Sequence, residues 1–236
     1  MKVTVLGVGN EFTPDITSTS FLITFVSNNK PRHFLVNCGW GVFKYLLAND
    51  IIPSLHGIFI TTTREDCIGN LSSLLLYMQI NNMQMPLLVG PDYTYTYLEL
   101  NKNLWYSKMY LSSPYQHLGV IDCRILKFKC RYGSTNGYGY LWQDEECKQS
   151  CIITGMSDQL NSICTRIPAN YDWIIFHDYA VNSSIYTSDN EIAKTYSPTI
   201  LKHLVGVHYG KCVSNVIDSV PELFEWGHSI VGPTTL

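Results

Sequence analysis

Short apolar segments alternate with turns along the whole chain, and this pattern predicts its secondary structure. Apolar runs of about four to eight residues between Gly, Pro, Asn or Ser predict strands, whereas apolar residues three and four apart predict helices. The predicted strands are Lys2–Leu6, Ser20–Val26, His33–Asn37, Gly57–Thr61, Met85–Val89, Gly119–Lys129, Gly137–Trp142, Cys151–Thr154, Trp173–Phe176 and Leu204–His208. The predicted helices are Gly41–Ala48, Gly69–Met78 and Tyr93–Tyr106, and Thr62–Cys67 is expected to be a polar loop. Strands followed by helices in both halves predict two helix-covered sheets in a single domain spanning residues 1–236.

Composition narrows the class of protein. Of the 236 residues, 46% are hydrophobic and 15% are charged, which excludes a disordered chain. No apolar run approaches the ~20 residues that span a bilayer, and the first residues lack the apolar region of a signal peptide. We therefore expect a cytoplasmic protein with no membrane partner. The net charge of −3 means that nucleic acid would need a local basic patch. The Asn- and Tyr-rich, Ala-poor usage is typical of a low-GC genome, such as that of a phage or its host.

The eight cysteines are expected to be mostly free thiols, because they are too sparse for a disulfide framework and no secretory signal accompanies them. Cys147 and Cys151 have a spacing that also occurs in zinc sites. No second pair with suitable spacing supports them, so the sequence favours ordinary thiols at these two positions.

Four blocks near the N-terminus carry a more specific pattern. They are Leu6-Gly7-Val8-Gly9-Asn10, Ser18-Thr19-Ser20-Phe21-Leu22-Ile23, Leu35-Val36-Asn37-Cys38-Gly39-Trp40-Gly41 and Ile60–Leu71. The first is not a dinucleotide-binding fingerprint, because the third glycine is missing. In order and spacing, the four blocks resemble the metallo-β-lactamase superfamily. The branch they resemble contains RNase Z and related phosphodiesterases, including phage-encoded enzymes that destroy cyclic-nucleotide signals. The resemblance implies a four-layer αββα sandwich with a zinc site along one edge between the sheets, and a homodimer.

The second half resembles the same family more weakly. Tyr138-Gly139-Tyr140 is similar to a Tyr-Gly-Tyr strand, and Ile153–Ser157 lies where a Ser-Gly-Asp-Thr element is expected. Ile174–Asp178 is similar to a strand that ends in His-Glu or His-Asp. Val207-His208-Tyr209 resembles the segment with the last metal-binding histidine. The resemblance therefore covers both halves of the chain.

The departures from the family fall on its metal ligands. Where the family's loop carries three histidines, this sequence has Thr62, Arg64 and Cys67, and the loop aspartate is kept as Asp66. The bridging aspartate of the Ser-Gly-Asp-Thr element aligns with Met156. No histidine precedes the Tyr-Gly-Tyr strand, where Cys130, Arg131 and Tyr132 stand instead. Of the ligands that the resemblance implies, only Asp66 and His208 remain.

This residue set predicts the loss of the metal-dependent reaction. A catalytic zinc normally has at least three protein ligands, and two remain. The guanidinium of Arg64 is always charged and only donates hydrogen bonds, so it would repel a divalent cation. Its charge must instead be balanced by Asp66, by Asp178 or by an anionic ligand. Without a metal to generate hydroxide, the hydrolysis is expected to be lost. We therefore expect a catalytically inactive protein without a cofactor.

Several alternatives stay open for these residues. Arg64 either fills the former metal site and pairs with Asp66, or replaces the charge of the metal and binds a phosphate. The ligand-binding set is then Thr62, Arg64, Asp66, Cys67 and His208. The relic catalytic candidates are Asp66, His208, His177 and Asp178, the last two as a hydrogen-bonded pair or in residual acid–base chemistry.

The alternative function is a surviving phosphodiesterase or nuclease with an altered mononuclear site. Asp66, His208 and Cys67, with Asp178 as a further ligand, would then hold zinc or manganese. In the inactive case the expected partners are a nucleotide, a cyclic nucleotide, RNA or a protein. Lys127, Lys129 and Arg131 form an alternating basic strand face, which is either solvated or attracts anions.

Overall fold

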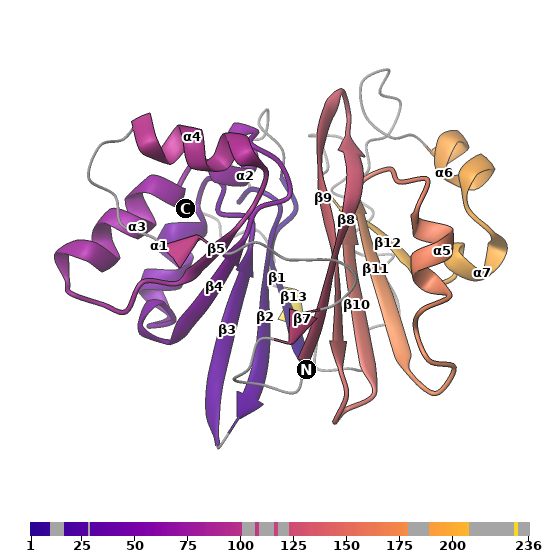
Figure 1. Cartoon of the computed structure of the whole chain (residues 1–236), viewed down its shortest axis with the longest axis horizontal. Coiled ribbons are helices and arrows are strands. Elements are labelled where there is room, and N and C mark those ends of the chain that lie inside the picture. The colour runs from indigo at the N-terminus through magenta and orange to yellow at the C-terminus, as the bar shows by residue number, and fades with distance from the viewer. Residues whose placement is uncertain are drawn as a thin grey trace. The chain divides into compact units, whose positions relative to one another are not determined.

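The computed structural model describes residues 1–9, 17–27, 29–100, 107–108, 116–117, 123–178, 189–207 and 229–230. The chain divides into two compact units. One consists of Lys2–Tyr110 with Tyr209–Leu236, and the other of Met1 with Leu111–His208. We call them the N-terminal unit and the C-terminal unit. Each contains one sheet, with helices against one of its faces (Figure 1).

The sheet of the N-terminal unit has the strand order β13-β1-β2-β3-β4-β5-β6. Pairs β1/β2 and β2/β3 are antiparallel, whereas β3 to β6 run parallel and β13 pairs in parallel with β1. The strands are β1 (Lys2–Gly7), β2 (Ser20–Ser27), β3 (Lys30–Val36), β4 (Leu55–Phe59), β5 (Leu87–Val89), β6 (Ser107–Lys108) and β13 (Ser229–Ile230). The helices are α1 (Val42–Ala48), the 3-10 turn η1 (Ile52–Ser54), α2 (Glu65–Ile68), α3 (Leu71–Ile80) and α4 (Asp92–Leu100).

Helix α3 shows how the apolar pattern builds this unit. Its buried residues are Leu71, Leu74, Leu75 and Met78, which follow the spacing of one helical face. They belong to the same core cluster as Leu46 of α1 and residues of β3 and β4. The helix ends at Ile80, two residues beyond the predicted end at Met78, and has Asn81 as its C-cap.

The sheet of the C-terminal unit has the order β12-β11-β10-β9-β8-β7, with β7 to β10 antiparallel and β10 to β12 parallel. Its strands are β7 (Gln116–His117), β8 (Cys123–Tyr132), β9 (Thr135–Asp144), β10 (Gln149–Thr154), β11 (Asp172–Asp178) and β12 (Leu204–Val207). Its helices are α5 (Leu160–Cys164), α6 (Asp189–Thr195) and α7 (Pro198–Leu201). Alternate residues of β8, including Phe128 and Cys130, pack into the core with residues of β9 to β11 and of the helices.

Several predicted boundaries were wrong. The strand predicted at Gly57–Thr61 is β4, Leu55–Phe59, and the loop predicted over Thr62–Cys67 contains helix α2. This helix has only four residues, so it is too short to show a helical period in the sequence. Strand β8 extends to Tyr132, beyond the predicted end at Lys129. The helix predicted over Tyr93–Tyr106 corresponds to α4, Asp92–Leu100, and its predicted end lies outside the described residues. The short helices α5, α6 and α7 were not predicted.

Among the described residues, no helix is both long and apolar enough to cross a membrane. The seven cysteines described are free thiols: Cys38, Cys67, Cys123, Cys130, Cys147, Cys151 and Cys164.

Candidate functional site

The central feature of the N-terminal unit is an ion pair at the start of helix α2. Arg64 occupies the N-cap position in an extended conformation, and Asp66 lies in the first turn of the helix. The Nε of Arg64 donates to Oδ1 of Asp66 at 3.2 Å, and its Nη2 donates to Oδ2 at 2.7 Å. The Asp66 side chain is fully buried and that of Arg64 is only 14% exposed. Of the partners that the sequence left open for Arg64, the structure shows Asp66, in a bidentate geometry.

The glycine-rich block around Cys38 supports this helix. The backbone N–H of Cys38 donates to the carbonyl of Cys67 at 2.7 Å, which joins the two segments. A Cβ on Gly39 would lie 1.9 Å from the carbonyl oxygen of Asp66, so only glycine allows this approach. The glycine in this family-like block is therefore needed because its backbone lies close to the backbone of Asp66.

Asn37 and Thr61 form a second support for the loop, and their pairing was not predicted from the sequence. Asn37 adopts a positive φ of 62°, and its side-chain oxygen accepts from the backbone N–H and the hydroxyl of Thr61 at 3.0 and 2.9 Å. Both residues are buried. The end of β3 is thereby tied to the segment that leads from β4 into the Arg64 loop.

The remaining positions of the predicted loop offer poor metal ligands. Thr62 is fully buried, and its hydroxyl has no hydrogen-bond partner among the described residues. The Sγ of Cys67 is buried and lies 3.8 Å from the Thr61 hydroxyl. The carboxylate of Asp66 is engaged by a guanidinium, which would repel a cation. Within the described part of the chain, no group of three or more His, Cys, Asp or Glu side chains could hold a metal ion. The described residues of this loop therefore do not fit the zinc ligands that the resemblance implies.

A second polar cluster lies at the end of β11, in the C-terminal unit. The Nδ1 of His177 lies 2.6 Å from the carbonyl oxygen of Asp178, and its Nε2 lies 3.2 Å from the hydroxyl of Tyr196. His177 is fully buried, and desolvation lowers its pKa, so the ring is neutral. A neutral ring that donates from Nδ1 must accept from Tyr196 through Nε2. The expected partnership of His177 with Asp178 is therefore made through the Asp178 backbone, and Tyr196 is a partner that the sequence did not suggest.

Tyr196 joins this histidine to the segment after β10. Its hydroxyl accepts from the backbone N–H of Ser157 at 3.2 Å and lies 3.5 Å from Sδ of Met156. Burial raises the pKa of Tyr196 to about 12, so the phenol stays protonated. Met156, which the resemblance aligns with a bridging aspartate, contributes an uncharged thioether to this cluster.

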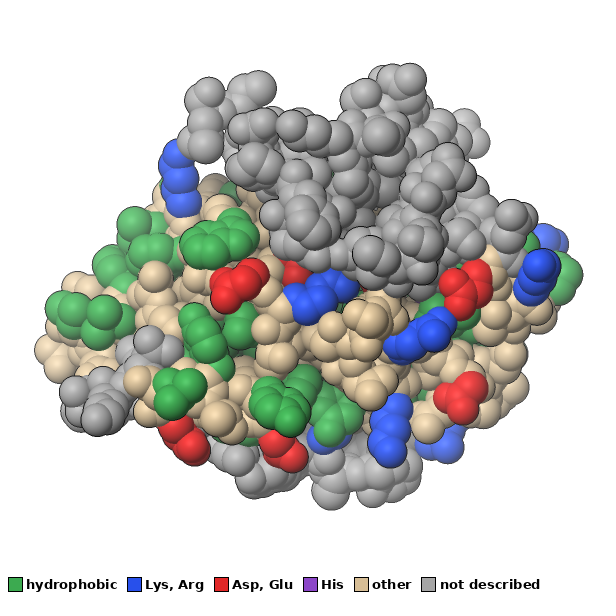
Figure 2. Space-filling model, turned by 90° about the horizontal axis from the view of Figure 1, so that it is seen from above, with side chains coloured by type: hydrophobic (Ala, Val, Ile, Leu, Met, Phe, Trp, Pro, Cys, Tyr) green, Lys and Arg blue, Asp and Glu red, His purple; other side chains and the backbone are tan. Residues whose placement is uncertain are grey.

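The basic face predicted on β8 is present. Lys129 and Arg131 are exposed and Lys127 is half-buried, with its Nζ 4.3 Å from the ring centroid of Tyr138. The face of the molecule seen in Figure 2 carries Lys and Arg side chains interspersed with Asp and Glu. The described charges on this face are therefore mixed in sign.

The structure groups the predicted site residues as follows. Thr62, Arg64, Asp66 and Cys67 lie together in the loop and helix α2 of the N-terminal unit. His177 and Asp178 end strand β11 of the C-terminal unit. His208, the other kept position, lies outside the described residues.

Comparison with solved structures defines the class. The chain has the metallo-β-lactamase fold. It is similar to the metallo-β-lactamase fold protein YhfI from Bacillus subtilis, with 16% identity, a TM-score of 0.66, and coverage of 88% of this chain and 85% of that one. Human tRNase Z, short form, has 15% identity, a TM-score of 0.62 and coverage of 88% and 92%. Yeast PDE1 has 12% identity, a TM-score of 0.66 and coverage of 89% and 88%. The expected αββα class, with its likeness to RNase Z and phosphodiesterases, is confirmed at the level of fold.

Among curated proteins, the chain is similar to the anti-Pycsar protein Apyc1 of Bacillus phage vB_BveM-Goe7. The two are 38% identical over 79 residues, which is 32% of this chain and 29% of that protein. The Apyc1 of Bacillus phage BSP38 is 35% identical over 77 residues, again 29% of its length. The chain thus matches less than a third of these relatives. No family model matches the sequence.

Proposed function

We propose that this protein is a catalytically inactive metallo-β-lactamase-fold protein that binds a nucleotide without hydrolysing it. The observation that carries the proposal is the bidentate ion pair between Arg64 and Asp66. It lies at the position where the resembled enzymes carry their metal-binding loop. The only carboxylate kept in that loop is therefore committed to a side chain that cannot lose its charge.

Binding a metal at this loop would require Asp66 to release Arg64. The released guanidinium would stay largely buried without its partner, and loss of one member of such a pair costs about 3–5 kcal/mol. A divalent ion beside it would add repulsion. Thr62 and Cys67 offer a hydroxyl and a buried thiol, so they do not compensate. The proposed inactivity therefore follows from the chemistry of the side chains present.

The nucleotide part of the proposal rests on the relatives. The sequence match is to phage anti-Pycsar proteins. Separately, the branch that the N-terminal blocks resemble includes phage-encoded enzymes that destroy cyclic-nucleotide signals. The solved structures of similar fold include a tRNase Z and a phosphodiesterase. A protein that kept the fold and gave up the reaction would sequester such a ligand. The phage relatives also support a phage origin for this chain.

Three measurements on the purified full chain test the proposal. Elemental analysis should find zinc and manganese well below one atom per chain. Thermal-shift measurements with 3′,5′-cyclic and 5′-monophosphate nucleotides should show stabilisation by at least one of them. Chromatography of the same mixtures should show no hydrolysis product. One metal per chain, together with cleavage that is lost in Asp66→Ala, would overturn the proposal in favour of a surviving hydrolase.

The homodimer and the protein partner expected from the resemblance stay predictions. Light scattering behind size-exclusion chromatography distinguishes a mass of 26.8 kDa from twice that value.

A further inference from the structure

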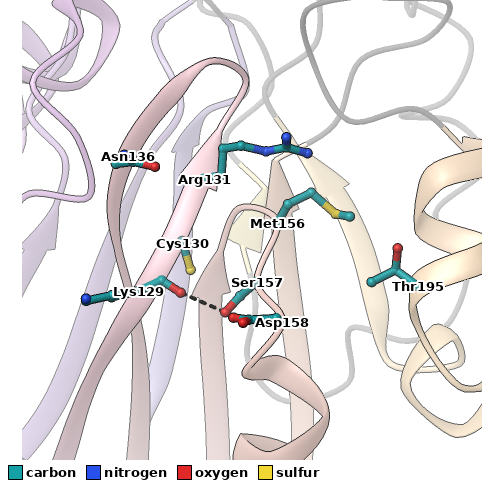
Figure 3. A pocket seen from close by; sticks show the side chains of 8 residues that line it. All are labelled: Lys129, Cys130, Arg131, Asn136, Met156, Ser157, Asp158 and Thr195. Atoms are coloured by element: carbon teal, nitrogen blue, oxygen red, sulfur yellow. Dashed lines mark hydrogen bonds between the residues drawn. The ribbon is translucent and has the colours of Figure 1, made fainter.

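A pocket of about 400 Å³ lies within the C-terminal unit, beside the last residues of β8. Figure 3 shows its lining, which comes from β8, from the start of β9, from the segment after β10 and from α6. The lining residues are Lys129, Cys130, Arg131, Asn136, Met156, Ser157, Asp158 and Thr195. Its volume falls within the range of about 300–1,000 Å³ that is usual for small-molecule sites. The Arg64 cluster (Thr62, Arg64, Asp66 and Cys67) contributes no residue to this pocket.

Hydrogen bonds hold the walls of this pocket in place. Arg131 and Met156 exchange backbone hydrogen bonds of 2.7 and 2.8 Å. The hydroxyl of Ser157 donates to the carbonyl of Lys129 at 2.7 Å, and its backbone N–H donates to the Tyr196 hydroxyl. The pocket is therefore formed before any ligand arrives, which lowers the entropic cost of binding.

The middle of the pocket is uncharged and rich in sulfur. Cys130 is buried, and its Sγ lies 3.0 Å from the hydroxyl of Thr154. Burial raises the pKa of the Cys130 thiol to about 12, so this wall carries no negative charge at neutral pH. The thioether of Met156 lies nearby in Figure 3. Polarizable sulfur atoms pack well against the faces of flat rings.

The lining of the pocket includes side chains of opposite charge. In Figure 3, Arg131 lies near the top of the labelled group and Asp158 near the bottom, with Cys130 and Met156 at heights between them, while the Lys129 side chain points away. Nη2 of Arg131 is 2.8 Å from Oε1 of Glu191, and these side chains are 55% and 41% exposed. An ion pair so exposed contributes little to stability, so a ligand can replace Glu191 as the partner of Arg131. A phosphate can accept two hydrogen bonds from a guanidinium, whereas Glu191 makes a single contact with Arg131, so the phosphate is expected to bind more strongly.

We propose that this pocket binds a mononucleotide, with its phosphate on Arg131, its base against Met156 and Cys130, and an N–H group of the base on Asp158. The inference rests on the proposed nucleotide binding but moves the ligand from Arg64 to Arg131. The Arg64 guanidinium is committed to the buried Asp66, whereas the partner of Arg131 within the described residues, Glu191, is exposed. Carboxylates accept hydrogen bonds from base N–H groups, as Asp and Glu do from cytosine.

The test compares two arginines of one strand. Arg124 and Arg131 both lie on β8, both are exposed, and each pairs with a glutamate, Arg124 with Glu145. Isothermal titration of the full chain would use the 5′-monophosphates and 3′,5′-cyclic monophosphates of the four ribonucleosides. Arg131→Gln should weaken the tightest ligand at least tenfold, whereas Arg124→Gln should leave its affinity within twofold. Glu191→Gln should strengthen binding about threefold, because Arg131 loses a competitor. Asp158→Asn should change the order of preference among the bases.

The outcomes separate this inference from the proposed function. If the wild type binds a nucleotide and Arg131→Gln binds it equally well, the pocket is not the site, although the protein remains a nucleotide binder. If Arg64→Gln alone abolishes binding, the ligand lies at the Arg64 cluster and the inference is wrong. If no nucleotide binds, both are wrong. If the wild type cleaves the nucleotide and Arg131→Gln prevents its binding, the pocket is supported and the inactivity is overturned.

Discussion

The side-chain oxygen of Asn37 accepts both the backbone N–H and the hydroxyl of Thr61, at 3.0 and 2.9 Å. This pairing joins the end of β3 to the segment after β4, and it does so from a residue held at a φ of 62°. Two distinct requirements therefore meet at one position: an acceptor for two buried donors, and a backbone in the left-handed region.

These requirements can be separated by two substitutions. Asn37→Gly keeps the backbone conformation accessible but removes the acceptor, and it should cost about 1–3 kcal/mol in the free energy of unfolding. Asn37→Ala should cost about 1–2 kcal/mol more, because its Cβ is strained at this φ. Urea denaturation measures both values. Equal values for the two variants would show that the backbone conformation carries no penalty.

The Arg64–Asp66 pair should behave as a buried, coupled unit. Arg64→Ala and Asp66→Ala are each expected to lower the free energy of unfolding by about 3 kcal/mol, because each leaves a buried charge unpaired. The double variant should lose less than the sum of the two, with a coupling of about 1–3 kcal/mol. Arg124→Ala, which breaks an exposed pair, is the control and should change stability by less than about 1 kcal/mol. Additive effects of the first two substitutions would contradict the bidentate pair.

Stability should fall as the pH is lowered below about 6.5. Desolvation lowers the pKa of His177 in the folded state from 6.5, and burial with the nearby charges of His56 and Lys2 lowers the pKa of His33. The unfolded chain therefore binds more protons below pH 6.5, and the free energy of unfolding decreases with falling pH in that range. Urea denaturation between about pH 7.5 and pH 5 measures the slope. His177→Gln and His33→Gln should each flatten it. Slopes unchanged in both variants would mean that other groups control the dependence.

Thiol reactivity should follow burial. Cys147 is exposed, whereas burial raises the pKa values of Cys38, Cys123 and Cys151. The thiolate is the reactive form, so iodoacetamide on the native protein should modify Cys147 well before these three. Peptide mass spectrometry over a time course identifies the order, and the urea-unfolded protein serves as the control in which all of them react. Early modification of Cys38 in the native state would contradict the packing of the N-terminal unit.

The sequence predicted most of the strands and the long helix α3, because apolar periodicity over several turns is a strong signal. It missed α2, α5, α6 and α7, which have four to seven residues each and too few apolar positions to show a period. The sequence predicted that the Arg64 guanidinium needs a counter-charge, but it left Asp66, Asp178 and an anionic ligand open, and the structure shows the pair with Asp66. The role of Tyr196 was not predictable. It depends on the fold bringing α6 and its following residue to β11, 19 residues away in the chain.

The contact between Arg64 and Asp66 also constrains how this sequence can evolve. Replacing Arg64 with a histidine would leave the buried Asp66 carboxylate without its permanent counter-charge. Replacing Asp66 first would remove the carboxylate that pairs with the Arg64 guanidinium. Either single step lowers stability before any metal can compensate, because Thr62 and Cys67 would also have to change. A change to the metal-binding loop of the resembled family would therefore need several substitutions, the first of which lowers stability. The ion pair thus makes the proposed loss of catalysis hard to reverse by single substitutions.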